Sequence, residues 1–106
     1  MPLTTATKGT LAHTQPSFTS GASNTLLAAN PNRTYLLIEN NSGANIMVNL
    51  NGDALTGIVP TSTNKGIVIT PNGSYESQPG ACPIGAITGY QTSGATVNTV
   101  SLVEGT

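Results

Sequence analysis

The sequence predicts a single-domain, all-β protein, an antiparallel β-sandwich or barrel. Segments in which polar and apolar residues alternate recur along the chain, and clusters of Gly, Pro, Asn and Ser separate them about every ten residues. No helix is expected. With 106 residues, of which 37% are hydrophobic and only one is Phe, the chain can form one modest core of Leu, Ile and Val.

Residues 1–22 are expected to form an extended N-terminal arm, with the sandwich domain at 23–106. The segment holds Thr, Ser, Gly and two prolines, and its apolar residues are isolated. Either it is a frayed terminus, or it becomes ordered against a neighbouring subunit. Its candidate capsid or subunit contacts are Leu3, Lys8, Leu11, His13 and Phe18.

Two strands at 33–40 and 45–51 form the strongest pattern, preceded by a short strand at 24–28. The NNSGAN turn between them predicts a β-hairpin, with Asn41 and Gly43 at positive φ. In the first strand, one face carries Leu36 and Ile38. The other face carries Arg33, Tyr35, Leu37 and Glu39, so the middle of the strand is apolar on both sides and we expect both faces to be covered. Arg33 and Glu39 are expected at opposite ends of the second face and not directly paired with each other.

The second strand alternates, which predicts one buried and one solvated face. Ile46, Val48 and Leu50 are expected to point inward, and Asn45, Asn49 and Asn51 outward. These inward residues belong to a predicted core that draws on every strong strand. Its members are Leu36, Ile38, Ile46, Val48, Leu50, Ile67, Ile69, Ile87, Val100 and Leu102.

Two more hairpins are expected downstream of a loop that has one short strand at 57–59. Pro71-Asn72-Gly73 joins strands at 66–70 and 74–78, and Thr92-Ser93-Gly94 joins strands at 85–91 and 95–104. The segment 78–85 is punctuated by Pro and Gly, so it crosses irregularly. In the last strand, the apolar positions fall out of step, which predicts a β-bulge near Asn98 or Thr99.

Charge and cysteine content exclude several classes of protein. Only 7% of residues are charged, against about 25% in a typical soluble domain, and the three basic residues are scattered, so nucleic acid is not expected as a partner. Cys82 is the sole cysteine, which rules out an intrachain disulfide and indicates a reducing compartment of synthesis. Neither a signal peptide nor a membrane span is expected.

The titratable residues do not suggest an enzyme. His13 is the only histidine, Cys82 has no basic neighbour, and the four acidic residues are dispersed, so no catalytic, cofactor or metal site is expected. Three tyrosines, at 35, 75 and 90, leave one alternative open. Together they would form a platform on which a sugar could stack, although strand tyrosines are more often half-buried.

Three segments resemble small structural proteins of tailed bacteriophages. They are AANPNRTYLLIENNSGANIMVNLNG (28–52), GIVITPNGSYE (66–76) and PIGAITGYQTSGATVNTVSLVEG (83–105). The resemblance implies a β-sandwich or jelly-roll domain and a non-catalytic virion protein, most simply a capsid decoration (cement) protein. It would be made in the host cytoplasm and bind the major capsid protein on the exterior of the head. The alternative is a tail or fibre component that binds carbohydrate or a receptor.

Self-association is expected as well. The thin core would gain from burying an apolar patch between subunits, and closed symmetry is the usual way to do so. A homotrimer is the first expectation, because an icosahedral shell offers three-fold positions.

Overall fold

The computed structural model describes residues 9–17, 19–92 and 100–106, and these residues form β-strands and no helix. The expectation of an all-β protein is confirmed for this part of the chain. In chain order the strands are β1 (Leu11–Thr14), β2 (Asn24–Leu27), β3 (Tyr35–Asn40), β4 (Ile46–Asn49), β5 (Ile67–Ile69), β6 (Ser74–Glu76), β7 (Ile87–Tyr90) and β8 (Val100–Gly105).

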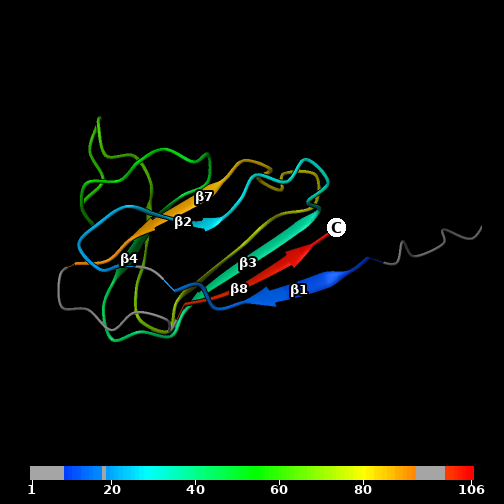
Figure 1. The fold of residues 1–106 in the computed structure, drawn as a ribbon, viewed down its shortest axis with the longest axis horizontal. Coiled ribbons are helices and arrows are strands. Elements are labelled where there is room, and N and C mark those ends of the chain that lie inside the picture. Colours follow the sequence, from blue (N-terminus) through cyan, green and yellow to red (C-terminus); the bar gives the residue numbers. More distant parts are fainter. Residues whose placement is uncertain (1–8, 18, 93–99) are drawn as a thin grey trace, which may run out of the picture.

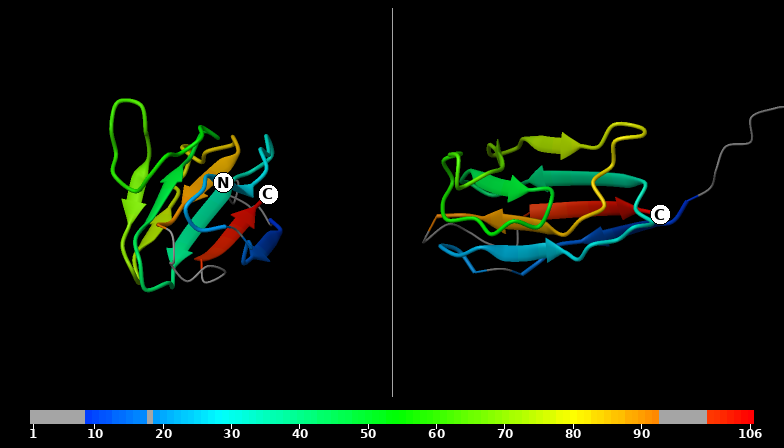
Figure 2. Two further views of the ribbon diagram at one scale, coloured as in Figure 1. Left: turned by 60° about the vertical axis from the view of Figure 1, so that its left-hand side comes forward. Right: turned by 90° about the horizontal axis from the view of Figure 1, so that it is seen from above.

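The strands form two four-stranded sheets, which pack face to face as a sandwich (Figures 1 and 2). The order is β1-β8-β3-β6 in sheet A and β2-β7-β4-β5 in sheet B, and every pairing is antiparallel. The inner faces meet in an aliphatic core. Its buried members are Leu26, Leu36, Ile38, Ile46, Val48, Ile69, Ile87, Val100 and Leu102.

Two predicted core residues are less buried than the rest. Leu50 is half-buried and packs against the core from the end of β4. Ile67 lies opposite Val48 on the inner face of β5 but remains 39% exposed. The reason is its position, because β5 is an edge strand with no neighbour to cover its outer side.

The three predicted hairpins are wrong. Strands β3 and β4 lie in opposite sheets, as do β5 and β6, and β7 and β8. The chain needs a polar turn both when it returns within one sheet and when it crosses to the facing sheet about 10 Å away. The turn sequence therefore does not distinguish a hairpin from a crossing. Among the described strands, the only consecutive ones that pair are β4 and β5, which a long loop separates.

Strand β4 has two covered faces instead of one, which corrects the prediction that Asn49 points to solvent. Ile46 and Val48 face the core, while Met47 and Asn49 are buried on the other side. The β4–β5 loop, residues 50–66, covers this second face. Its Asn64 side chain reaches Met47, with 3.7 Å between Nδ2 and Sδ.

Strand β3 shows the reverse, since its second face is not covered by the described residues. Leu36 and Ile38 are fully buried, whereas Tyr35 and Leu37 are half-buried and Glu39 is exposed. The strand is central in its sheet, between β8 and β6, as its apolar character indicated. One side of that sheet is open.

Several local expectations also need correction. Residues 57–59 form bends instead of a strand, and neither Asn41 nor Gly43 has a positive φ. The β3–β4 turn is held instead by the buried Asn40 side chain, which bonds to the carbonyl oxygens of Ala44 and Ile69, both at 2.8 Å. The predicted bulge near residues 98 and 99 lies outside the described residues.

The predicted arm contains the first strand of the sandwich. Leu11–Thr14 pairs with β8 as β1, and Thr10 exchanges two backbone hydrogen bonds with Thr106 at 3.1 and 3.0 Å. Over residues 9–17, the segment therefore belongs in part to sheet A. Residues 1–8 and Phe18 lie outside the described residues.

Candidate binding face

The outer face of sheet A, which we call the open face, is the surface best suited to binding. Alternation along the strands and the pairing registers place side chains from all four strands on it. These residues are Leu11 and His13 of β1, Ser101 and Val103 of β8, Tyr35, Leu37 and Glu39 of β3, and Ser74 and Glu76 of β6.

An apolar strip runs across the middle of the open face. Leu37 and Val103 are paired neighbours on β3 and β8, and both are half-buried. Beside them, the side chains of Tyr35 and Leu11 cover Gly105, which is buried. A Cβ added at Gly105 would lie 3.0 Å from Tyr35 Cβ and 3.1 Å from Leu11 Cδ2, so these two side chains flank it. Leu11 itself is 59% exposed.

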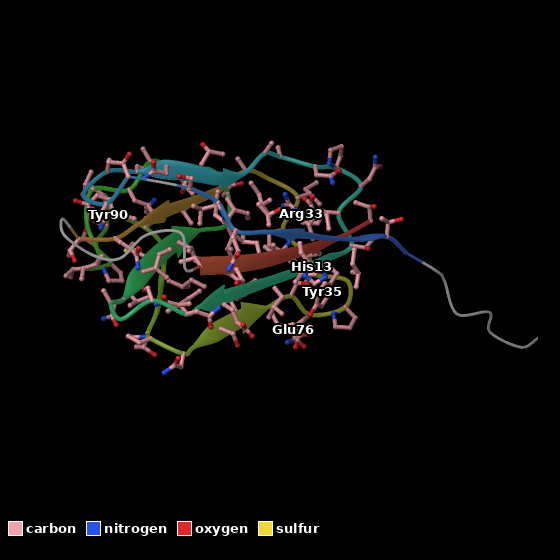
Figure 3. The ribbon with its side chains drawn as sticks, turned by 60° about the horizontal axis from the view of Figure 1, so that its bottom comes forward. His13, Arg33, Tyr35, Glu76 and Tyr90 are labelled. Carbon is pink, nitrogen blue, oxygen red and sulfur yellow. The ribbon has the colours of Figure 1, made fainter. Side chains whose placement is uncertain are left out.

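Polar groups border the strip at the β6 edge. The Tyr35 hydroxyl donates a 2.7 Å hydrogen bond to the Glu76 carboxylate (Figure 3). This bond, with smaller contributions from burial and from the negative charge of Glu76, raises the pKa of Tyr35. The pair lines an open groove of about 350 Å³ with Thr34, Ser77, Gln78 and Pro79.

The outer face of sheet B is covered by the chain itself. The 50–66 loop lies against β4 and β7 (Figure 1) and places Leu55 in a buried position. Two hydrogen bonds anchor the loop: Thr88 Oγ1 donates to the Asp53 carbonyl at 2.6 Å, and the Leu55 N–H donates to Ser23 Oγ at 2.9 Å. Of the two outer faces, the open face of sheet A is therefore the one left for a partner.

Arg33 is not on the open face, contrary to expectation, because β3 begins only at Tyr35. Its guanidinium is buried and donates from Nε to Glu104 at 2.7 Å and from Nη2 to the Ala28 carbonyl at 2.8 Å. Nη1 donates to the carbonyls of Pro83 and Gly85 at 2.7 and 2.9 Å. One side chain thus fastens three separate parts of the chain, and its role is structural.

The other chemically versatile side chains are spread over the domain. Tyr35 is on the open face, Tyr75 faces the core, and Tyr90 lies at the opposite end of the molecule from Tyr35 (Figure 3), so the three do not form a platform. Burial, and to a lesser degree Cys82, raises the pKa of Tyr75. Cys82 packs partly against the core. Among the described residues, no three His, Cys, Asp or Glu side chains are grouped to hold a metal ion.

Of the predicted contact residues, Leu11 and His13 lie on the open face. Leu3, Lys8 and Phe18 lie outside the described residues. Tyr35, Leu37 and Glu39 share the open face as their alternation indicated, but the sequence analysis expected this face to be covered. Val103 and Glu76 were not predicted to join them, because the pairing of β3 with β8 and β6 brings together residues distant in sequence.

Comparisons with protein-family models, with curated proteins and with solved structures give no match to this chain. In the described part of the chain, no helix has the length and apolar character needed to cross a membrane.

Proposed function

We propose that the protein is a non-catalytic virion structural protein, a decoration (cement) protein that binds the outside of a tailed-bacteriophage head through the open face. The major capsid protein is the proposed partner. The resemblance of three sequence segments to small phage structural proteins supplies the class of protein, and the structure supplies a surface for attachment.

The asymmetry between the two outer faces is the observation that carries the proposal. A 17-residue loop covers the outer face of sheet B. By contrast, no described residue covers Leu37, Val103 and Leu11 on the outer face of sheet A. An exposed apolar strip with a polar border is typical of a protein-binding site. On a head that presents many equivalent sites, modest contacts by each subunit sum through avidity once subunits are linked.

The strand order supports the finer assignment of a jelly roll, which we include in the proposal. In a jelly roll, eight strands fold as Greek keys into two four-stranded sheets, a fold found in viral capsid proteins. Here successive strands along the chain alternate between the two sheets, apart from β4 and β5, which both lie in sheet B. The resulting orders are β1-β8-β3-β6 and β2-β7-β4-β5. Fold alone does not determine function, so this observation supports the proposal without deciding it.

The alternative, a tail or fibre component that binds carbohydrate, rests on the groove beside Tyr35. An aromatic ring next to the carboxylate of Glu76 and to Pro79 offers one stacking surface and one acceptor for sugar hydroxyls. A single ring is a small platform. We therefore rank this function second.

Co-sedimentation with phage heads separates the two functions. The purified protein is mixed with procapsids and expanded heads that lack it, and bound protein is measured after pelleting. The decoration function predicts saturable binding with a fixed number of copies per head, and heads that withstand heating better. Saturable binding to a defined glycan, with no protein in the head pellet, would replace it with the fibre function.

A further inference from the structure

The outer edge of β1 is an unprotected sheet edge. Thr10 and Thr106 exchange both backbone hydrogen bonds, so in the same register Ala12 and Thr14 direct their N–H and C=O groups to β8. Leu11 and His13 therefore direct theirs away from the sheet. No described residue bonds to these outward groups.

The three other edges have the features by which natural sheets discourage pairing. β2 has an irregular register between Thr25 and Leu27. β5 and β6 are only three residues long, and β6 carries the exposed Glu76. By contrast, β1 has four residues in regular register, and between Gly9 and Gln15 it has no proline, no Lys, Asp or Glu, and no bulge.

We propose that β1 pairs antiparallel with β1 of a second copy of this chain, so that the two A sheets join into one eight-stranded sheet. An antiparallel edge is complementary to itself, since a two-fold axis places each outward N–H opposite an outward C=O. Strand β1 carries no Lys, Arg, Asp or Glu, so like charges of these residues do not repel a second copy.

The backbone geometry fixes the register of this dimer. The arrangement centred on Ala12 is the one in which both outward residues pair within β1, Leu11 with the partner's His13 and His13 with the partner's Leu11. Ala12 then lies opposite the partner's Ala12 in a non-hydrogen-bonded pair. The two strands approach most closely at such a pair, so a small side chain fits there. Pro16 follows in the parity that faces β8 and has no N–H, so it cannot extend the pairing of β1 with β8.

The two-fold axis stands perpendicular to the joined sheet, so both open faces point the same way. The strip formed by Leu37, Val103 and Leu11 then continues across the interface into the strip of the second copy. The dimer would present one larger attachment surface, but its formation does not depend on head binding. The homotrimer expected from the sequence was argued from the three-fold positions of an icosahedral shell, whereas the edge of β1 fits a dimer with a two-fold axis.

Light scattering with matched proline variants tests the edge. His13→Pro removes an outward N–H without breaking a bond to β8, whereas Ser74→Pro places a proline on the open side of β6, at the other edge of the same sheet. We expect twice the monomer mass for the wild type and for Ser74→Pro, and dimerisation weakened more than about tenfold in His13→Pro. A monomeric wild type, a trimer, or equal masses for all three proteins would overturn the proposal.

A cysteine pair tests the register in the folded protein. Under mild oxidation, Ala12→Cys should form a disulfide-linked dimer, because the two Cα atoms of a non-hydrogen-bonded pair lie about 4.5 Å apart, within the range that a disulfide spans. Thr14→Cys should not, since two positions 14 would be too distant to bridge, and the wild type controls for Cys82. Cross-linking of Thr14→Cys but not of Ala12→Cys would contradict the register, and cross-linking of neither would contradict the interface.

Discussion

At the scale of single residues, the fold depends on a buried charged clamp. Arg33 lies just before β3 and Glu104 lies in β8, and Arg33 Nε and Glu104 Oε2 are 2.7 Å apart. The same guanidinium also satisfies carbonyls before β3 and before β7. One buried side chain therefore joins parts of the chain that lie far apart in sequence.

Removing one partner of this pair should be costly. Arg33→Met would leave Glu104 and three carbonyl groups without their donor, and we expect a loss of about 3–5 kcal/mol in the free energy of unfolding, measured by denaturant titration. The double variant Arg33→Met with Glu104→Leu should recover part of that loss, since no unpaired carboxylate remains. A single variant as stable as the wild type would show that the clamp does not hold the fold.

The Tyr35 hydroxyl provides a test at high pH. Its pKa is raised by the hydrogen bond to Glu76, so the folded state holds this proton more tightly than the unfolded state. The bond thus adds stability below the ordinary tyrosine pKa of about 10, and the contribution is lost as pH rises through the higher folded pKa.

Titration of phenolate absorbance measures this shift. Glu76→Gln should move one tyrosine to a lower pKa, and Tyr35→Phe identifies which one by removing its signal. An unchanged titration curve in Glu76→Gln would contradict the assigned bond.

At the scale of the elements, the position of a strand within its sheet decides how much each aliphatic residue contributes. Ile38 is fully buried in the central strand β3, whereas Ile67 faces the core from the edge strand β5. We expect Ile38→Ala to lower the free energy of unfolding by about 2–5 kcal/mol and Ile67→Ala to lower it by clearly less. Equal losses of stability in the two variants would contradict the placement of β5 at an uncovered edge of sheet B.

Close packing beneath the 50–66 loop requires a glycine where the loop enters β5. A Cβ at Gly66 would lie 2.5 Å from the Val48 carbonyl oxygen and 2.9 Å from Met47 Cε, while a Cβ at Gly43 would meet nothing within 4 Å. Gly66→Ala should therefore lower the thermal midpoint through a cost of about 1–3 kcal/mol, and Gly43→Ala should leave it nearly unchanged. The opposite order would argue against the packing of the loop on sheet B.

Alternation predicted strands at the positions of β2 to β8 and most of their inward residues, but it missed β1, added a strand at 57–59 and did not give the pairing partners. Leu36, Ile38 and Val48 point to the core as expected, because side-chain direction follows from a period of two within one strand. The hairpins failed because a turn sequence does not specify whether the next strand joins the same sheet. The open face was missed for the same reason: whether Leu37 or Met47 is covered depends on a loop elsewhere in the chain.

At the scale of the whole molecule, the domain is a sandwich with one outer face covered by its own loop and the other open. On this view, the open face attaches to the phage head, and edge pairing through β1 would enlarge it. The proposed attachment would depend on a few apolar side chains of sheet A, so it can be tested by charge substitutions that leave the core intact.

The most direct test compares head binding by Leu37→Lys and Val59→Lys. Leu37 lies at the centre of the open face opposite Glu76, which would accommodate a lysine, while Val59 is 66% exposed in the loop on the other side of the sandwich. Both variants should fold, as thermal unfolding would verify. We expect Leu37→Lys to lose co-sedimentation with heads while Val59→Lys binds like the wild type; full binding by Leu37→Lys would contradict attachment through the open face.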